Sequence, residues 1–317
     1  MYPRALHAHP ITVKENATGT SSSQIGPFSW SHTGMQGWRE SMEDSYIVNC
    51  DDQNFTGLGF FCVFDGHGGD EVALEVEKMF HETLISVSDV KTAGKAGKSD
   101  VPKLLEKGVD TGFRQVDNHL KTLNVDSGCT ANVVVATKSH ISCANIGDSR
   151  SILVRSGMAL ALSKDHKPTD EGETDRIKKA GGSVIRGRVC GGVAVSRSFG
   201  DFNFKAGKNL DASKQQISCC PDFVHYEREV DSDEFIVVCC DGVWDMLSND
   251  GVGRFVRTRI QAGIDDMSKI GEMLLDYCLE KGSKDNMTCV IVLLPAGQAL
   301  LDEAKKEKSI MGCLKAI

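Results

Sequence analysis

The sequence has no apolar run long enough to cross a membrane, no excess of basic residues and no paired-cysteine motif. Its longest apolar stretches, residues 235–240 and 290–294, fall far short of the roughly 18 residues that a membrane-spanning helix needs. Acidic residues outnumber basic ones by 44 to 36, and the net charge of -8 has the wrong sign for a protein that binds nucleic-acid phosphates. We therefore expect no membrane span and no nucleic-acid partner.

The cysteines point to a reducing environment. The twelve of them form no CxxC pair and show no regular spacing, so they do not predict a disulfide scaffold. Cys62, Cys239, Cys240 and Cys289 lie inside apolar, strand-like runs, where free cysteine behaves as a small hydrophobic residue. Because this usage is typical of a reducing compartment, we expect a cytoplasmic protein, with the nucleus left open.

Short apolar runs alternate with turn signals along most of the chain. Residues 1–25 are polar and predict an N-terminal tail. Helical periodicity marks residues 69–85, 102–122, 250–262 and 267–281, and a charged helix or tail is expected over 297–317. The runs rich in Val, Ile, Phe and Cys predict strands over residues 46–49, 58–64, 130–137, 140–146, 151–155, 223–229, 234–240 and 287–294.

The predicted strands show little alternation of polar and apolar residues, which indicates burial on both faces. Two sheets packed together, with helices outside, would bury strands in this way. Residues 163–201 differ, because they are rich in charge and glycine and contain a helix of their own that Gly181 and Gly182 end. We expect this segment to be a surface flap on one domain that covers residues 26–296.

Acidic residues lie at the ends of several predicted strands, often beside glycine. They are Glu43, Asp44, Asp65, Asp148, Asp241 and Asp285. A single Asp-Gly pair more often marks a turn than a ligand. Together, however, these carboxylates would meet on one rim of the fold and repel one another strongly unless cations offset their charge. The pattern therefore predicts a divalent-metal site.

The types of ligand narrow the choice of metal. Oxygen ligands without a matching set of histidines or cysteines favour magnesium, manganese or calcium over zinc, and magnesium or manganese fits catalysis better. A water shared by two such ions is acidic enough to supply hydroxide near neutral pH. Gly66 has no side chain, so its backbone carbonyl could approach a metal closely. Asp245 lies four residues after Asp241, so in a helical turn both carboxylates face the same way.

A series of short motifs follows in order along the chain. They are GWRESMED (37–44), FDGHGG (64–69), SGCTA (127–131), NIGDSR (145–150), DHKP (165–168), AGG (180–182), AVSR (194–197), DGVWD (241–245) and DN (285–286). This series resembles the metal-dependent serine/threonine protein phosphatases of type 2C. The resemblance covers about residues 35–294, and each motif is unusually specific.

The resemblance implies both a fold and a metal centre. The fold is α+β, an α/β/β/α sandwich of two central, mostly antiparallel β-sheets flanked by helices, with a flap subdomain. One edge of the sandwich would hold two Mg²⁺ or Mn²⁺ ions and a weaker third. Asp148 and Asp245 match the third position, which shares Asp241. The residues that match the two-ion centre are Glu43, Asp44, Asp65, Gly66, Asp241 and Asp285.

Two further residues match catalytic positions of the family. Arg39 matches the arginine that holds the phosphoryl oxygens, and its planar fork suits two oxygens of a dianion. His67 matches the proposed general acid, since its reference pKa of about 6.5 would let it protonate the departing oxygen. Taken alone, Arg39 would more often be a surface ion pair, and His67 could cap a turn.

The flap matches the family with one departure. Cys190 stands where the family commonly has asparagine, and we expect a buried, inert thiol rather than an oxidisable one. Arg186 and Arg188, like Arg176, are candidates for contact with a phosphopeptide. Charged residues on a flap are nevertheless more often merely solvated.

The resemblance implies hydrolysis of phosphoserine and phosphothreonine in proteins by a hydroxide that bridges two Mg²⁺ or Mn²⁺ ions. The sequence has no Cys-x5-Arg loop, which argues against a cysteine-nucleophile phosphatase, and its histidines do not form the motifs of calcineurin-like phosphoesterases. The alternative is a pseudophosphatase that binds phosphoproteins without turnover, although such a protein should have lost metal carboxylates. We expect phosphoprotein substrates and, since no heptad repeat is present, a monomer.

Overall fold

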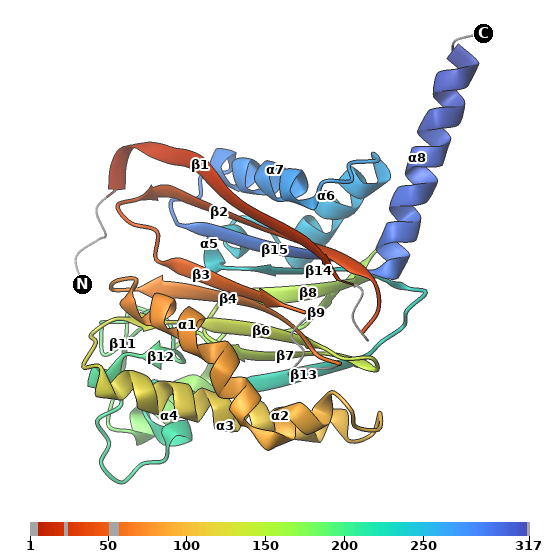
Figure 1. Ribbon diagram of the computed structural model, residues 1–317. Coiled ribbons are helices and arrows are strands. Elements are labelled where there is room, and N and C mark those ends of the chain that lie inside the picture. Colours follow the sequence, from red (N-terminus) through yellow and green to blue (C-terminus); the bar gives the residue numbers. More distant parts are fainter. Residues whose placement is uncertain (1–5, 22–24, 51–56, 316–317) are drawn as a thin grey trace.

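Two antiparallel β-sheets packed face to face form the centre of the molecule, and helices cover both outer faces (Figure 1). The computed structural model describes residues 6–21, 25–50 and 57–315. Its layers follow the order helix, sheet, sheet, helix, which confirms the predicted α/β/β/α sandwich. Within these residues, no helix is both long enough and apolar enough to cross a bilayer.

The strands of each sheet come from distant parts of the sequence. The first sheet contains, in spatial order, β1 (Leu6–Ser21), β2 (Phe28–Arg39), β15 (Met287–Leu293), β14 (Asp233–Cys239), β8 (Arg150–Arg155) and β9 (Met158–Ala161). The second contains β12 (Phe199–Gly200), β5 (Gly128–Cys129), β4 (Gly59–His67), β6 (Ala131–Ala136), β7 (His140–Ile146) and β13 (Asp222–Glu227), with β3 (Asp44–Asn49) beside β4.

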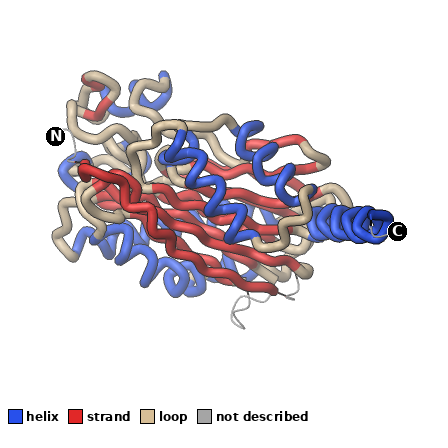
Figure 2. The backbone as a smooth tube through the Cα atoms, turned by 90° about the horizontal axis from the view of Figure 1, so that it is seen from above, coloured by secondary structure: helices blue, strands red, loops and turns tan. Residues whose placement is uncertain are grey.

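The helices divide into two groups. The second sheet is covered by α1 (Glu71–Ser86), α2 (Ser88–Ala93) and α3 (Val101–Thr122). The first sheet is covered by α6 (Asn249–Gln261), α7 (Met267–Glu280) and the beginning of α8 (Pro295–Lys315). The end of α8 projects beyond the sheets, as the view from above shows (Figure 2). A one-turn helix, α5 (Asp241–Trp244), follows β14 directly.

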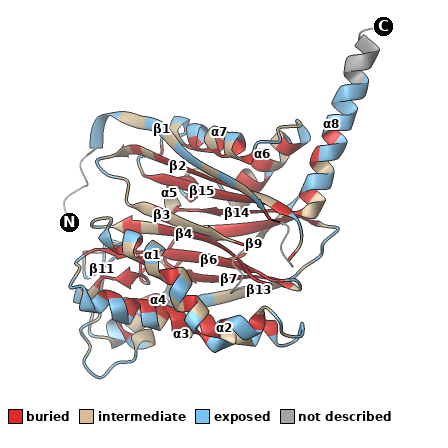
Figure 3. Ribbon diagram, in the orientation of Figure 1, coloured by how far each residue is buried: buried red, intermediate tan, exposed pale blue. Residues whose placement is uncertain are grey.

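Apolar side chains fill three layers, and this explains why the central strands lack a polar face (Figure 3). Along β4, Phe60, Cys62 and Phe64 pack toward α1 and α3, whereas Phe61 and Val63 pack between the two sheets. Successive residues of a strand point to opposite faces, so a strand buried on both sides needs apolar residues at every position. The third layer lies between the first sheet, α6 and α7.

The sequence patterns do not predict β1 or β2. Residues 1–25 are expected to be a polar tail, but Leu6–Ser21 forms a strand at the edge of the first sheet. Most of its side chains are exposed, so it has no apolar face, and the backbone ladder to β2 holds it in place. Strand β2 buries Ser31, His32 and Thr33, whose polarity hides the strand pattern. Residues 1–5 and 22–24 of the expected tail lie outside the described residues.

The flap carries the predicted helix, α4 (Glu171–Lys179), and a small hairpin of β10 (Val184–Ile185) and β11 (Arg188–Val189). Gly181 has a φ of 81°, in the left-handed region that favours glycine after a helix. Ile177 and Val189 of the flap pack with Ile217 in a small apolar cluster. The flap therefore has a core of its own, separate from the sandwich.

Candidate metal centre

Strand pairing brings the predicted acidic residues to one edge of the sandwich. Strands β3 and β4 are antiparallel, and their register places Asp44 opposite Asp65. Strands β14 and β15 are also antiparallel, so Asp241, just after β14, lies at the same end as Asp285, just before β15. Because the two sheets stack, these pairs meet at one site.

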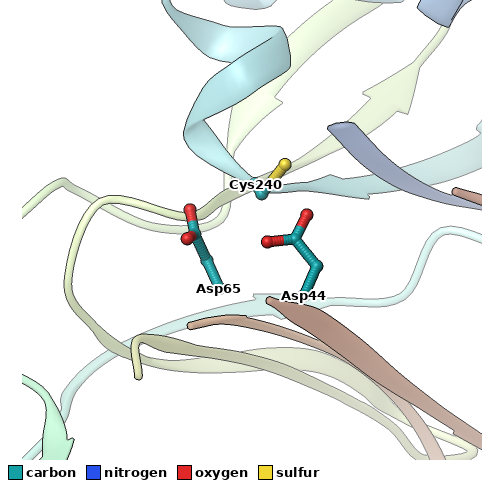
Figure 4. Close-up of side chains that lie close together, drawn as sticks. All are labelled: Asp44, Asp65 and Cys240. Atoms are coloured by element: carbon teal, nitrogen blue, oxygen red, sulfur yellow. The ribbon is translucent and has the colours of Figure 1, made fainter. Parts of the chain in front are cut away.

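The carboxylates lie close enough to share cations. Oxygen atoms of Asp65, Asp148 and Asp241 all lie within 4.8 Å of one another. Side-chain atoms of Asp44, Asp65 and Cys240 form a second group of the same size, and Figure 4 shows these three side chains close together. Sequence reasoning did not assign Cys240 to the site. Burial, and then the charges of Asp44 and Asp65, raise the pKa of its thiol well above the usual value.

The electrostatics of this cluster are unfavourable without added positive charge. Burial, and then the charges of neighbouring carboxylates, raise the pKa values of Asp65 and Asp241 well above their usual range. For Asp44, burial is again the largest cause and outweighs a 2.7 Å hydrogen bond from Thr288 Oγ1, so its pKa rises to about 7. A hard divalent cation would relieve this repulsion, so the residues present fit a magnesium or manganese centre.

Gly66 allows a close approach between strands at the centre. Its amide donates to the carbonyl of Glu43 at 3.1 Å. A Cβ atom at this position would lie 2.2 Å from the same carbonyl oxygen, so any side chain would push the strands apart. Asn286, whose role the sequence did not reveal, fixes the same segment: it accepts from the Glu43 amide at 3.0 Å and donates to the Ser41 carbonyl at 2.9 Å.

One cation of the chain itself enters the cluster. Lys167 Nζ lies 2.5 Å from Asp148 Oδ2, and this ion pair is half-buried. Asp245 follows α5 and its pKa is raised, first by burial and then, against the opposing effect of Lys167, by the charge of Asp148. Sequence reasoning missed Lys167, because its contact with Asp148 depends on how the flap returns to the sandwich.

Arg39 and His67 both border the same cavity as the carboxylates. The cavity has a volume of about 430 Å³, and Asp65, Asp148 and Asp285 form part of its wall. Arg39 Nη2 donates to Asp285 Oδ2. The guanidinium therefore lies beside the acidic cluster with further N–H groups available in the cavity.

His67 has a partner that the sequence did not reveal. Its Nε2 lies 2.7 Å from Oδ2 of Asp201, which is 134 residues away in the chain. Burial would raise the pKa of Asp201, but the charge of His67 and a 2.5 Å hydrogen bond from Ser198 Oγ lower it. Asp201 therefore orients the imidazole of His67 through this contact.

The flap residues predicted for substrate contact do not all reach the cavity. Arg188 borders it, whereas Arg186 is exposed and does not. Arg176 is engaged elsewhere, in a buried contact of 2.6 Å with Glu173, which removes it from the substrate candidates. The expectation for Cys190 is wrong, because this thiol is exposed, at a backbone φ of 49°.

The fold and the site agree with a comparison of the sequence with known families. Residues 29–287 match the family model described as protein phosphatase 2C, and the chain belongs to that family. This confirms the resemblance inferred from the motifs.

Particular relatives are known by name. Protein phosphatase ppm-1.A of Caenorhabditis elegans is 38% identical over 299 residues, which cover 90% of this chain and 63% of that protein. Protein phosphatase 1B of Bos taurus is 36% identical and is covered to 63%, and protein phosphatase 1A of Homo sapiens is 34% identical and is covered to 78%. The chain thus spans less than two thirds of the length of the first two relatives.

Solved structures share the fold. A phosphatase from a pathogenic strain of Toxoplasma gondii superimposes with a TM-score of 0.74 at 22% identity, over 88% of this chain and 96% of that one. The serine-threonine phosphatase 2C of Toxoplasma gondii also gives 0.74, at 23% identity, over 89% of this chain and 100% of that one. At this level of identity the likeness supports the sandwich architecture alone.

Proposed function

We propose that this protein hydrolyses phosphoserine and phosphothreonine in other proteins, using two Mg²⁺ or Mn²⁺ ions and a weaker third. The observation that carries the proposal is the group of buried, mutually repelling carboxylates that borders the 430 Å³ cavity beside Arg39. Residues that would hold the two ions are Glu43, Asp44, Asp65, Gly66, Asp241 and Asp285, and the third would lie among Asp148, Asp241 and Asp245.

Each protein group has a separate task in this reaction. Two divalent ions held by these carboxylates would offset negative charge and would lower the pKa of water for its use as the nucleophile. Arg39 binds two phosphoryl oxygens with its planar fork, and its contact with Asp285 fixes the direction of that fork. His67, oriented by Asp201, donates a proton to the departing serine or threonine oxygen.

The first test is an assay of phosphate release from a phosphothreonine peptide and a small aryl phosphate. Purified protein is measured with Mn²⁺, with Mg²⁺ and with EDTA. We expect release only when a metal is present. Absence of release from folded protein with either metal would instead favour the pseudophosphatase, which binds phosphoproteins without turnover.

Two further proposals concern the cellular location and the oligomeric state of the protein. We place the protein in the cytosol, because every cysteine that the structure describes is a free thiol and most are buried. We also propose that it acts as a monomer on phosphoprotein substrates. Light scattering of the purified chain tests the monomer directly.

A further inference from the structure

Two cations on the rim of the cavity form no ion pair with the residues that the structure describes. Lys284 and Arg188 both border the cavity and are exposed. Across the part of the chain that the structure describes, no carboxylate lies within the 4.0 Å ion-pair distance of either side chain. The other two cations of this region differ, because Arg39 pairs with Asp285 and Lys167 pairs with Asp148.

Lys284 is nevertheless held in place. Its Nζ lies 3.9 Å from the ring centroid of Trp38, a cation–π contact. Trp38 directly precedes Arg39, and Lys284 directly precedes Asp285, so this contact joins the same two segments that the Arg39–Asp285 hydrogen bond joins. A lysine fixed in this way loses less side-chain entropy when it binds an anion than a freely moving one.

Arg188 extends from the flap with most of its guanidinium unused. Nη1 donates to the carbonyl of Gly192 at 2.9 Å, which fixes the side chain across the hairpin. A guanidinium carries five N–H donors, so the remaining ones can meet a second anion. Apolar side chains also border the cavity, among them Val193, Ala194 and Leu6.

From this arrangement we infer that Lys284 and Arg188 select substrates with acidic side chains next to the phosphorylated residue. The inference rests on the proposed phosphatase function and names the substrate class of the same site. The phosphoryl group would occupy the centre beside Arg39, and the flanking residues of the peptide would cross the rim. Aspartate, glutamate or a second phosphorylated residue there would pair with the two free cations.

The test compares two phosphothreonine peptides of equal length, one with acidic and one with neutral residues on both sides. The measured quantity is the ratio of their kcat/KM values. We expect the wild type to favour the acidic peptide, Lys284→Met to reduce the ratio by about fivefold, and Lys284→Glu to reduce it by roughly tenfold or more. The loss should appear mainly in KM, because the flanking charges bind substrate and transition state alike.

Lys281 offers a matched control. Its Nζ lies 4.9 Å from the ring centroid of Tyr277, so it makes the same type of contact, but it does not border the cavity. Lys281→Glu changes the net charge as much as Lys284→Glu does, and we expect it to leave the ratio unchanged. If both variants lowered the ratio equally, the preference would come from overall charge and the inference would be wrong.

A small aryl phosphate, which has no flanking residues, distinguishes failure of the substrate preference from failure of the phosphatase function. Wild type that hydrolyses the aryl phosphate but treats both peptides equally would overturn the substrate inference and leave the phosphatase function standing. Wild type that releases no phosphate from any substrate, with metal present, would overturn the function itself.

Discussion

Two groups of charged residues, one on the rim of the cavity and one at the base of the flap, show opposite arrangements. At the base of the flap, Glu173 contacts Arg176 at 2.6 Å and Arg197 at 2.8 Å, and Arg197 also contacts Asp222 at 2.7 Å. Positive and negative groups are therefore equal in number there. On the rim, the cations Arg39 and Lys167 pair with two of five carboxylates, and Lys284 and Arg188 are exposed and pair with none of them. The five carboxylates are Asp44, Asp65, Asp148, Asp241 and Asp285.

The pKa values express this difference. Burial would raise the pKa of Glu173, but hydrogen bonds and charges from Arg197 and Arg176 lower it to about 2. On the rim, burial and like charges act together and raise the pKa values of Asp65 and Asp241. Buried charge that the chain itself neutralises stabilises the fold, whereas buried charge left in excess binds a cation.

The largest expected effect comes from removing a rim carboxylate. Asp241→Ala should abolish phosphate release, by at least about a thousandfold, because the residue borders all the proposed ion positions. The variant should remain folded, and without metal its unfolding temperature should equal or exceed that of the wild type because repulsion is reduced. Phosphate release with Mn²⁺ and thermal unfolding in EDTA measure the two effects. Asp65→Ala should behave in the same way, and normal turnover in either variant would refute the metal assignment.

At the base of the flap, removing a carboxylate should destabilise the fold instead. Glu173→Gln leaves the largely buried Arg176 without a carboxylate and Arg197 with Asp222 alone, and should lower the free energy of unfolding by about 3 kcal/mol. Because the folded-state pKa of about 2 lies below the usual 4.5, the stabilisation is complete above pH 4.5 and is lost as the pH falls toward 2. Urea unfolding of wild type and variant across this range checks the prediction. A difference that stayed constant down to pH 2 would contradict it.

Metal binding should stabilise the protein through the carboxylates on the rim of the cavity and should not depend on the ion pairs of the flap. At a Mn²⁺ concentration 100 times the dissociation constant, the free energy of unfolding should rise by about 2.7 kcal/mol. Thermal unfolding with and without Mn²⁺ measures this gain. Glu173→Gln should show the same gain and Asp65→Asn little or none. An equal gain in Asp65→Asn would place the metal elsewhere.

The smallest effect on stability is expected for a surface ion pair that lies outside both regions. Lys107 Nζ contacts Asp89 at 3.0 Å on the surface, and the lysine is largely exposed. Lys107→Met should change the free energy of unfolding by less than about 0.5 kcal/mol and leave phosphate release unchanged. If Lys107→Met lowered the free energy of unfolding as much as Glu173→Gln does, burial would not explain the difference between surface and buried ion pairs.

Sequence patterns locate the acidic residues on the rim of the cavity better than the residues that contact them, and the reason is physical. Asp65 lies near the end of β4, and Asp241 follows β14 after one residue. Both strands are largely buried on both faces, so a local pattern locates the two carboxylates. Asp201, which orients His67, and Lys167, which pairs with Asp148, depend on the path by which the flap returns to the sandwich. No local pattern encodes that path. Strand β1 escaped prediction because its backbone, rather than an apolar face, holds it to β2.

The exposed thiol on the flap has a practical consequence. Among the cysteines whose surroundings the structure describes, only Cys190 is exposed, and the others are buried. Of these described cysteines, Cys190 alone should therefore react with a maleimide dye in the folded protein. The residue lies two positions after Arg188, so the emission of such a dye would report how the flap responds when a phosphopeptide enters the cavity.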